Sequence, residues 1–202
     1  MTRPLVYLVD DDASVREGLT LLLESAGLAV SAHARAEDML AAYLPCVPAC
    51  LVLDLALPGH SGLELQEMLL ARGFHPPIIF LTGHCDVPAA VKALKLGAMD
   101  FLQKPVIDPQ TLLDRVETAI ARHRLQLERD ATRNRAQGLL AMLTPRERQV
   151  MDSIVAGKAN KVMAMELGIS ERTVEQHRAR VMHKLEVHSV PDLVRLVQEA
   201  SN

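Results

Sequence analysis

The sequence predicts an α/β fold with a five-stranded parallel sheet, followed by a small all-α domain. Over residues 1–108, five short apolar runs alternate with segments of helical periodicity. This alternation is the pattern of parallel strands joined by crossover helices. From about residue 139 onward the pattern is helical only. A chain of 202 residues is long enough for two such domains.

The five strands are expected at the apolar runs, which have the length of buried parallel strands. They cover approximately residues 5–9, 28–33, 50–54, 77–81 and 99–102. The helices between them are VREGLTLLLESAG, AEDMLAAYL, GLELQEMLLARG and VPAAVKALKLG. Three of these four segments close on a glycine, which is a common end for a helix. The order strand, helix, strand therefore repeats through the whole first domain.

A long helix is predicted next, from Pro109 to about Leu140. Its first turns carry apolar residues at helical spacing, and after Leu127 it is almost wholly polar. A polar helix of this kind is stabilised by ion pairs along its own surface or by pairing with a second copy. We interpret it as the last helix of the first domain running on as an exposed linker. The expected divisions are residues 1–120 for the first domain, 121–138 for the helical linker and 139–202 for the second domain.

Helix start and stop signals organise the second domain. Thr144 is the predicted cap of LTPRERQVMDSIVAG, with Pro145 in the first helical position and Glu147 three residues after the cap. NKVMAMELG stops at Gly168, and Ser170 is the predicted cap of ERTVEQHRARVMHKL. A last helix follows in VPDLVRLVQEA. Two helices joined by a tight turn with a glycine form a helix-turn-helix.

Composition and charge exclude several classes of protein. No apolar run approaches the ~20 residues that cross a bilayer, and the acidic start does not suit a signal peptide. We therefore expect a soluble, cytoplasmic protein without a membrane partner. The three cysteines show no metal-ligand spacing, and their odd number argues against a disulfide framework. The net charge is −6 over residues 1–108 and +1 over residues 139–202, which indicates two domains with different partners.

Polar groups stand at the ends of four predicted strands. Asp10 and Asp11 follow the first strand, and Asp54 ends the third. Thr82 follows the fourth strand, and Lys104 follows the fifth. Because the carboxyl ends of parallel strands meet at one edge of a sheet, these side chains should form one site. Three carboxylates, a hydroxyl and an amine suit an aspartate that is phosphorylated with the help of Mg²⁺, which prefers oxygen ligands.

An enzyme that uses Asp54 as a phosphatase nucleophile is a rival interpretation. Phosphatases of the haloacid dehalogenase type carry a second aspartate two residues later, and this position is Ala56 here. The sequence therefore favours a protein that receives a phosphoryl group over an enzyme.

The motifs resemble a known family over nearly the whole chain. VYLVDDD, CLVLDLALPGHSG, IIFLTGH and DFLQKP are similar to the motifs of the receiver domain of two-component response regulators. LTPRERQVMDSIVAGKANK and LGISERTVEQHRARVMHKL resemble the LuxR-type helix-turn-helix domain. Together they resemble the FixJ/NarL family, with the FixJ branch closest. This implies a doubly wound, CheY-like sheet of strand order 2-1-3-4-5.

The same resemblance implies the chemistry of the receiver. A sensor histidine kinase would phosphorylate Asp54, with Mg²⁺ held by Asp11, Asp54 and the backbone carbonyl of Ala56. Asp10 would act on the metal through water. Lys104 would contact the phosphoryl group, and the peptide bond from Lys104 to Pro105 would be cis.

The resemblance also implies how the signal leaves the site. Thr82 and Phe101 would be a switch pair that moves on phosphorylation. Val91 and Lys95, together with Phe101, are candidates for coupling the site to formation of a homodimer, although Val91 could instead be ordinary core. The dimer would bind promoter DNA and, with RNA polymerase as a further partner, activate transcription.

Seven residues of the helix-turn-helix are candidates for DNA contact. They are Lys161, Arg172, Thr173, Glu175, Gln176, Arg180 and Lys184. The second helix of such a motif lies in the major groove, and contact with phosphates is the expected role of Lys161, on the first helix, and of Lys184. Val174, Val181 and Leu185 mark the apolar face of the second helix. For each candidate, an ordinary solvated surface residue is the alternative.

Cys85 departs from the family pattern, in which a glycine is frequent in the loop after Thr82. A Cβ at this position limits the backbone conformations of the loop. A constitutive DNA-binding regulator, whose receiver serves only for dimerisation, is therefore kept as an alternative.

Overall fold

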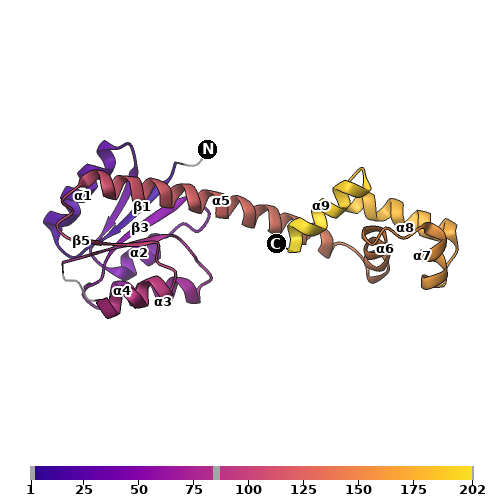
Figure 1. Ribbon diagram of the computed structural model, residues 1–202, viewed down its shortest axis with the longest axis horizontal. Helices are drawn as coiled ribbons and strands as arrows, with labels where there is room; N and C mark the ends of the chain where they lie inside the picture. Colours follow the sequence, from indigo (N-terminus) through magenta and orange to yellow (C-terminus); the bar gives the residue numbers. More distant parts are fainter. Residues whose placement is uncertain (1–2, 84–86, 202) are drawn as a thin grey trace. The chain divides into compact units, whose positions relative to one another are not determined.

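The computed structural model describes residues 3–83 and 87–201 (Figure 1). It divides into two compact units, Met1–Leu127 and Glu128–Asn202. Cys85, on which the constitutive alternative rests, lies outside the described residues.

The first unit is a parallel five-stranded sheet with helices on both faces. Its strands have the order β2-β1-β3-β4-β5, which confirms the predicted fold class. In chain order the elements are β1 (Leu5–Val9), α1 (Ala13–Ser25), β2 (Ala29–His33), α2 (Ala36–Ala42), β3 (Ala49–Asp54), α3 (Gly62–Ala71), β4 (Ile78–Thr82), α4 (Val87–Lys95) and β5 (Asp100–Gln103).

Alternate strand residues point to opposite faces and build two apolar cores. One core joins β-strand residues such as Val52 and Ile79 to α1 and α5 (Pro109–Ala141). The other joins residues such as Leu53 and Phe80 to α2, α3 and α4. The ribbon shows the same two layers of helices on either side of the sheet (Figure 1). The three central strands β1, β3 and β4 are therefore almost wholly buried, which fixes the positions of their ends.

The second helix ends two residues earlier than the segment AEDMLAAYL suggests, at Ala42. Tyr43 has extended backbone angles, and its side chain is buried beside Phe74. Leu44 precedes a proline, which disfavours the helical conformation, and its N–H donates to the Tyr7 hydroxyl at 2.9 Å. Contacts of Tyr43 with Phe74 and of Leu44 with Tyr7 thus stabilise an extended turn, and the helix ends before it.

Helix α5 extends from the first unit into the second without a break at Gly138. Its N-terminal half packs on the sheet through Leu112, Val116 and Ile120. Farther along, the Nδ1 atom of His123 accepts a hydrogen bond from the Ala49 N–H at 2.9 Å. The first residues of the expected linker, 121–138, therefore still contact the start of β3.

The second unit contains the end of α5 and four further helices around one core. They are α6 (Pro145–Val155), α7 (Asn160–Leu167), α8 (Glu171–Lys184) and α9 (Val190–Ser201). Thr144 and Glu147 form the predicted capping box at the start of α6, and Ser170 caps α8. Val174, Val181 and Leu185 are fully or almost fully buried, so the predicted apolar face of α8 is confirmed. None of the helices described here is long and apolar enough to cross a membrane.

Candidate functional site

The predicted strand-end groups meet at the carboxyl edge of the sheet. Asp10 follows β1 directly, Asp54 is the last residue of β3, and Thr82 is the last residue of β4. Lys104 follows β5. Three of these residues, Asp10, Asp54 and Thr82, are buried, with at most 8% of their surface exposed. Buried polar groups need partners, so this edge of the sheet is a polar site rather than a set of solvated turns.

The Lys104 ammonium lies between two carboxylates. Its Nζ donates to Asp10 Oδ2 at 2.5 Å and to Asp54 Oδ2 at 2.7 Å. Burial alone would lower the pKa of Lys104, but the hydrogen bonds to Asp10 and Asp54 outweigh it, and the pKa is raised overall. Lys104 therefore stays protonated at neutral pH and neutralises part of the negative charge.

The acidic cluster carries more negative charge than this one ammonium balances. Carboxylate oxygens of Asp10, Asp11 and Asp54 all lie within 4.8 Å of one another. Their donor set consists of hard oxygens without sulfur or nitrogen, which is what Mg²⁺ prefers. The three residues therefore fit a divalent cation of this kind.

Backbone N–H groups orient two of the carboxylates. Asp54 Oδ1 accepts from the Ala56 N–H at 3.2 Å, and Asp10 Oδ1 accepts from the Asp12 N–H at 3.1 Å. Ala56 thus lies beside Asp54 through its N–H, while the role of its carbonyl oxygen stays a prediction. The Lys104–Pro105 bond is cis, as the resemblance implies.

Two neighbours of this site escaped the sequence interpretation. A Cβ on Gly62 would lie 2.3 Å from the Asp54 carbonyl oxygen, so only glycine fits there. Arg16 donates from Nη1 to the carbonyl oxygens of Asp10 at 2.7 Å and Asp11 at 2.9 Å. The available signals were weak: a glycine directly after the helix cap Ser61, and an arginine in the helix that follows three aspartates.

The proposed switch residues occupy neighbouring strands. The Phe101 ring is partly buried and lies 6.4 Å from that of Phe80. Its N–H donates to Asp100 Oδ1 at 2.8 Å. The Lys104 N–H donates to the Thr82 carbonyl at 2.7 Å, so the strand that carries Phe101 is tied to the site. Val91 is 44% exposed, which excludes the alternative that it is ordinary core.

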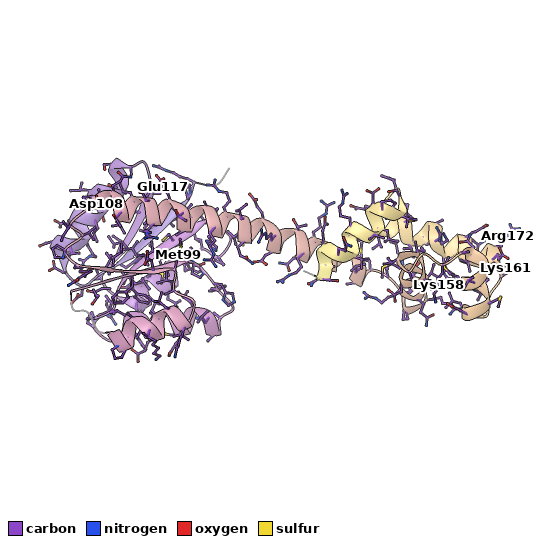
Figure 2. All side chains as sticks on the ribbon, in the orientation of Figure 1. Met99, Asp108, Glu117, Lys158, Lys161 and Arg172 are labelled. Carbon is purple, nitrogen blue, oxygen red and sulfur yellow. The ribbon has the colours of Figure 1, made fainter. Side chains whose placement is uncertain are left out.

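The helix-turn-helix is formed by α7 and α8, joined by a turn in which Gly168 has a φ of 64°. This left-handed conformation favours glycine. Lys161 and Arg172 project from the first turns of the two helices (Figure 2). Five of the seven predicted contact residues are exposed, namely Lys161, Arg172, Glu175, Gln176 and Arg180.

The other two candidates have partners within the second unit. The Thr173 hydroxyl shares a hydrogen bond of 2.8 Å with the Ser170 cap. Lys184 Nζ donates to Glu147 Oε2 at 2.7 Å, and the Glu147 residue is only 4% exposed. Lys184 therefore joins the end of α8 to the start of α6, and its contact with DNA stays a prediction.

A strand-end aspartate beside a lysine, on one chain with a helix-turn-helix, defines the class of two-component response regulators with a DNA-binding output domain. Comparison with known families agrees with this class. Residues 6–117 match the response regulator receiver domain, and residues 141–197 match the bacterial regulatory proteins of the luxR family.

Similarity to individual proteins extends over nearly the whole chain. The transcriptional regulatory protein FixJ of Azorhizobium caulinodans is 48% identical over 191 residues, which cover 95% of this chain and 90% of that protein. Nodulation protein W of Bradyrhizobium diazoefficiens is 46% identical, with coverage of 96% and 86%. The structure of the response regulator StyR is 44% identical, covers 98% of this chain and 100% of that chain, and has a TM-score of 0.90. Full-length FixJ from B. japonicum is 41% identical, with coverage of 100% and 98% and a TM-score of 0.58.

The chain belongs to the FixJ/NarL family of response regulators, in its FixJ branch. It is a regulator of transcription and not an enzyme. The phosphatase interpretation is thereby excluded.

Proposed function

We propose that Asp54 receives a phosphoryl group from a partner histidine kinase, and that this modification makes the protein dimerise on promoter DNA. The observation that carries this proposal is the contact of Lys104 with both Asp10 and Asp54 at the carboxyl edge of the sheet. Asp54, two further carboxylates and the Lys104 ammonium thus share one small site, which supports Asp54 as the acceptor. The cytoplasm, where promoter DNA is found, is the proposed location.

In the transfer step, an Asp54 carboxylate oxygen attacks the phosphorus atom of the kinase phosphohistidine. The bond from phosphorus to oxygen forms while the bond from phosphorus to the imidazole nitrogen breaks, and the electron pair of that bond stays on the nitrogen. Asp11, Asp54 and the Ala56 carbonyl would hold Mg²⁺, with Asp10 acting through water. When bound, the metal offsets the negative charge that develops on the phosphoryl oxygens.

Lys104 changes partner during this step. The ammonium now paired with Asp54 moves to a phosphoryl oxygen, and Asp10 continues to accept a hydrogen bond from it. Thr82 donates its hydroxyl to a second phosphoryl oxygen. The charge at the end of β3 thus grows from −1 on the carboxylate to about −2 on the phosphoryl group, and this draws two groups from the ends of β4 and β5 toward it.

Movement of Thr82 is the proposed output of the receiver. Phe101 turns into the space that Thr82 leaves, and this changes the surface formed by α4 and β5, where Val91 and Lys95 lie. Two receivers then pair through that surface, and two copies of α8 read neighbouring half-sites on DNA. Proposed contacts with bases and phosphates come from Lys161, Arg172, Thr173, Glu175, Gln176, Arg180 and Lys184.

The bound dimer would activate transcription by contact with RNA polymerase. We assign these roles to a receiver at residues 1–120 and a DNA-binding domain at residues 139–202, with residues 121–138 between them.

Acetyl phosphate and Mg²⁺ test the acceptor directly. We expect one phosphoryl group per chain, stable in acid and labile in base, and none on Asp54→Asn. Asp114→Asn, an exposed aspartate on α5, is the matched control and should be labelled as wild type is. Undiminished labelling of Asp54→Asn would overturn the assignment.

A further inference from the structure

Arg16 contacts the main chain of the acidic turn rather than its carboxylates. It lies near the start of α1, is partly buried, and donates from one nitrogen to the carbonyl oxygens of Asp10 and Asp11 at 2.7 and 2.9 Å. Hydrogen bonds from a charged donor are stronger than neutral ones. A single guanidinium thus fixes the orientation of two successive peptide groups.

These peptide groups follow Asp10 and Asp11 in the chain, so their orientation sets the direction of the two carboxylates that are proposed to act on the cation. The turn is already tied at its ends, because the Asp10 N–H donates to the His33 carbonyl at 3.2 Å and Asp12 Oδ1 accepts from the Ser14 N–H at 2.8 Å. Asp11 lies between these ties, and the Arg16 bond to its carbonyl restrains it. Rotation of that peptide would turn the Asp11 carboxylate away from Asp54.

The two positive groups of the site differ in what happens when a cation binds. Lys104 occupies carboxylate oxygens of Asp10 and Asp54 and must give up part of this contact. Arg16 occupies carbonyl oxygens and none of the carboxylate oxygens that would hold the cation, so it remains in place.

We propose that Arg16 is a positioning residue of the cation site, which holds the carbonyls of Asp10 and Asp11 so that their carboxylates face the site before a divalent cation binds. This inference rests on the proposed function, because it takes the cation to be the one that supports phosphorylation of Asp54.

Calorimetric titration of the full-length protein with Mg²⁺ tests it. Arg16→Ala should raise the Kd for Mg²⁺ about tenfold, because binding must then also order the turn. Arg16→Lys keeps a charge without the reach to both carbonyls and should raise the Kd by a smaller factor. The control is Arg3→Ala, which removes an arginine that also donates to a carbonyl, that of Gly27, outside the site. Its Kd should stay within about twofold of wild type.

A second measurement separates positioning from general damage to the fold. With acetyl phosphate in excess, saturating Mg²⁺ should restore the labelling rate of Arg16→Ala to within about twofold of wild type. A rate that stays low at saturating Mg²⁺, or a Kd equal to wild type in both Arg16 variants, would overturn the proposal. If Arg16→Ala does not fold, Arg16→Lys decides by the same two criteria. Failure of the wild type itself to bind Mg²⁺ would instead remove the metal from the proposed function, and with it the role of Arg16.

Discussion

Substitution of Glu147 tests what stabilises the DNA-binding unit. The Glu147 carboxylate accepts from the Thr144 N–H and hydroxyl, each at 2.9 Å, and from Lys184 Nζ at 2.7 Å. It thereby joins the first turn of α6 to the last turn of α8, the helix proposed to read DNA. Glu147→Gln keeps the size of the side chain but removes its charge.

The pKa of Glu147 sets the size of the stability loss expected for Glu147→Gln. The hydrogen bond from Lys184, followed by that from the Thr144 backbone, lowers this pKa from 4.5 to about 2. A difference of this size corresponds to at most about 3 kcal/mol in the free energy of unfolding, and solvent screening at Lys184, whose side chain is 35% exposed, reduces it to about 1–2 kcal/mol. Because the folded-state pKa lies below the unfolded one, this contribution is complete above about pH 4.5 and is lost as the pH falls toward 2.

The change in stability is measured by unfolding the full-length protein in urea at pH 7, with hydrogen exchange of the α6 and α8 amides as the probe. Glu147→Gln should lower the stability of these helices by about 1–2 kcal/mol and flatten its dependence on acid pH. The control is Glu166→Gln, since Glu166 also contacts a lysine at 2.7 Å, but on the surface with 46% of its side chain exposed. Its loss should be below about 1 kcal/mol. Equal losses in the two variants would refute the argument.

Three further changes address the receiver and the DNA. Gly62→Ala places a Cβ 2.3 Å from the Asp54 carbonyl oxygen and should lower the free energy of unfolding in urea by about 1–3 kcal/mol. Gly138→Ala, in open space within α5, should not lower it, and an unchanged stability of Gly62→Ala would contradict the predicted clash. Lys104→Ala frees the carboxylates of Asp10 and Asp54 and should lower the Kd for Mg²⁺ roughly 3–10-fold by calorimetry, whereas a higher Kd would show that the ammonium does not compete with the cation. Arg172→Ala should weaken binding to specific DNA by about 1–3 kcal/mol more than to random DNA in anisotropy titrations, and equal losses would assign Arg172 to the phosphate backbone.

The cluster of polar groups at the strand ends was predictable because its positions follow from topology. Once the apolar runs are interpreted as parallel strands, the residues after them must meet at one edge, however far apart they are in the chain. Asp10 and Lys104 are 94 residues apart, and their contact needs no other information than strand direction and order. The strand order itself came from the resemblance to receivers.

Contacts that depend on side-chain direction were not predictable. By its sequence pattern, Lys184 is an unpaired lysine on the helix that is predicted to contact DNA. Its contact with Glu147 depends on the packing of α8 against α6. Arg16 and Gly62 are ordinary helix residues by pattern, and their roles arise from how closely main-chain groups approach them. The early end of α2 depends on the Tyr7 hydroxyl, which lies 37 residues before its partner Leu44.

Control of DNA binding by a phosphate on Asp54 is the core of the proposed function. It is tested by titrating the full-length protein, with and without acetyl phosphate and Mg²⁺, into DNA selected from a random pool by the phosphorylated protein. We predict that phosphorylation tightens binding of the wild type at least tenfold, about 1.4 kcal/mol, and leaves Asp54→Asn unchanged. Equal affinity of the phosphorylated and unphosphorylated wild type would contradict it and favour a constitutive DNA-binding regulator.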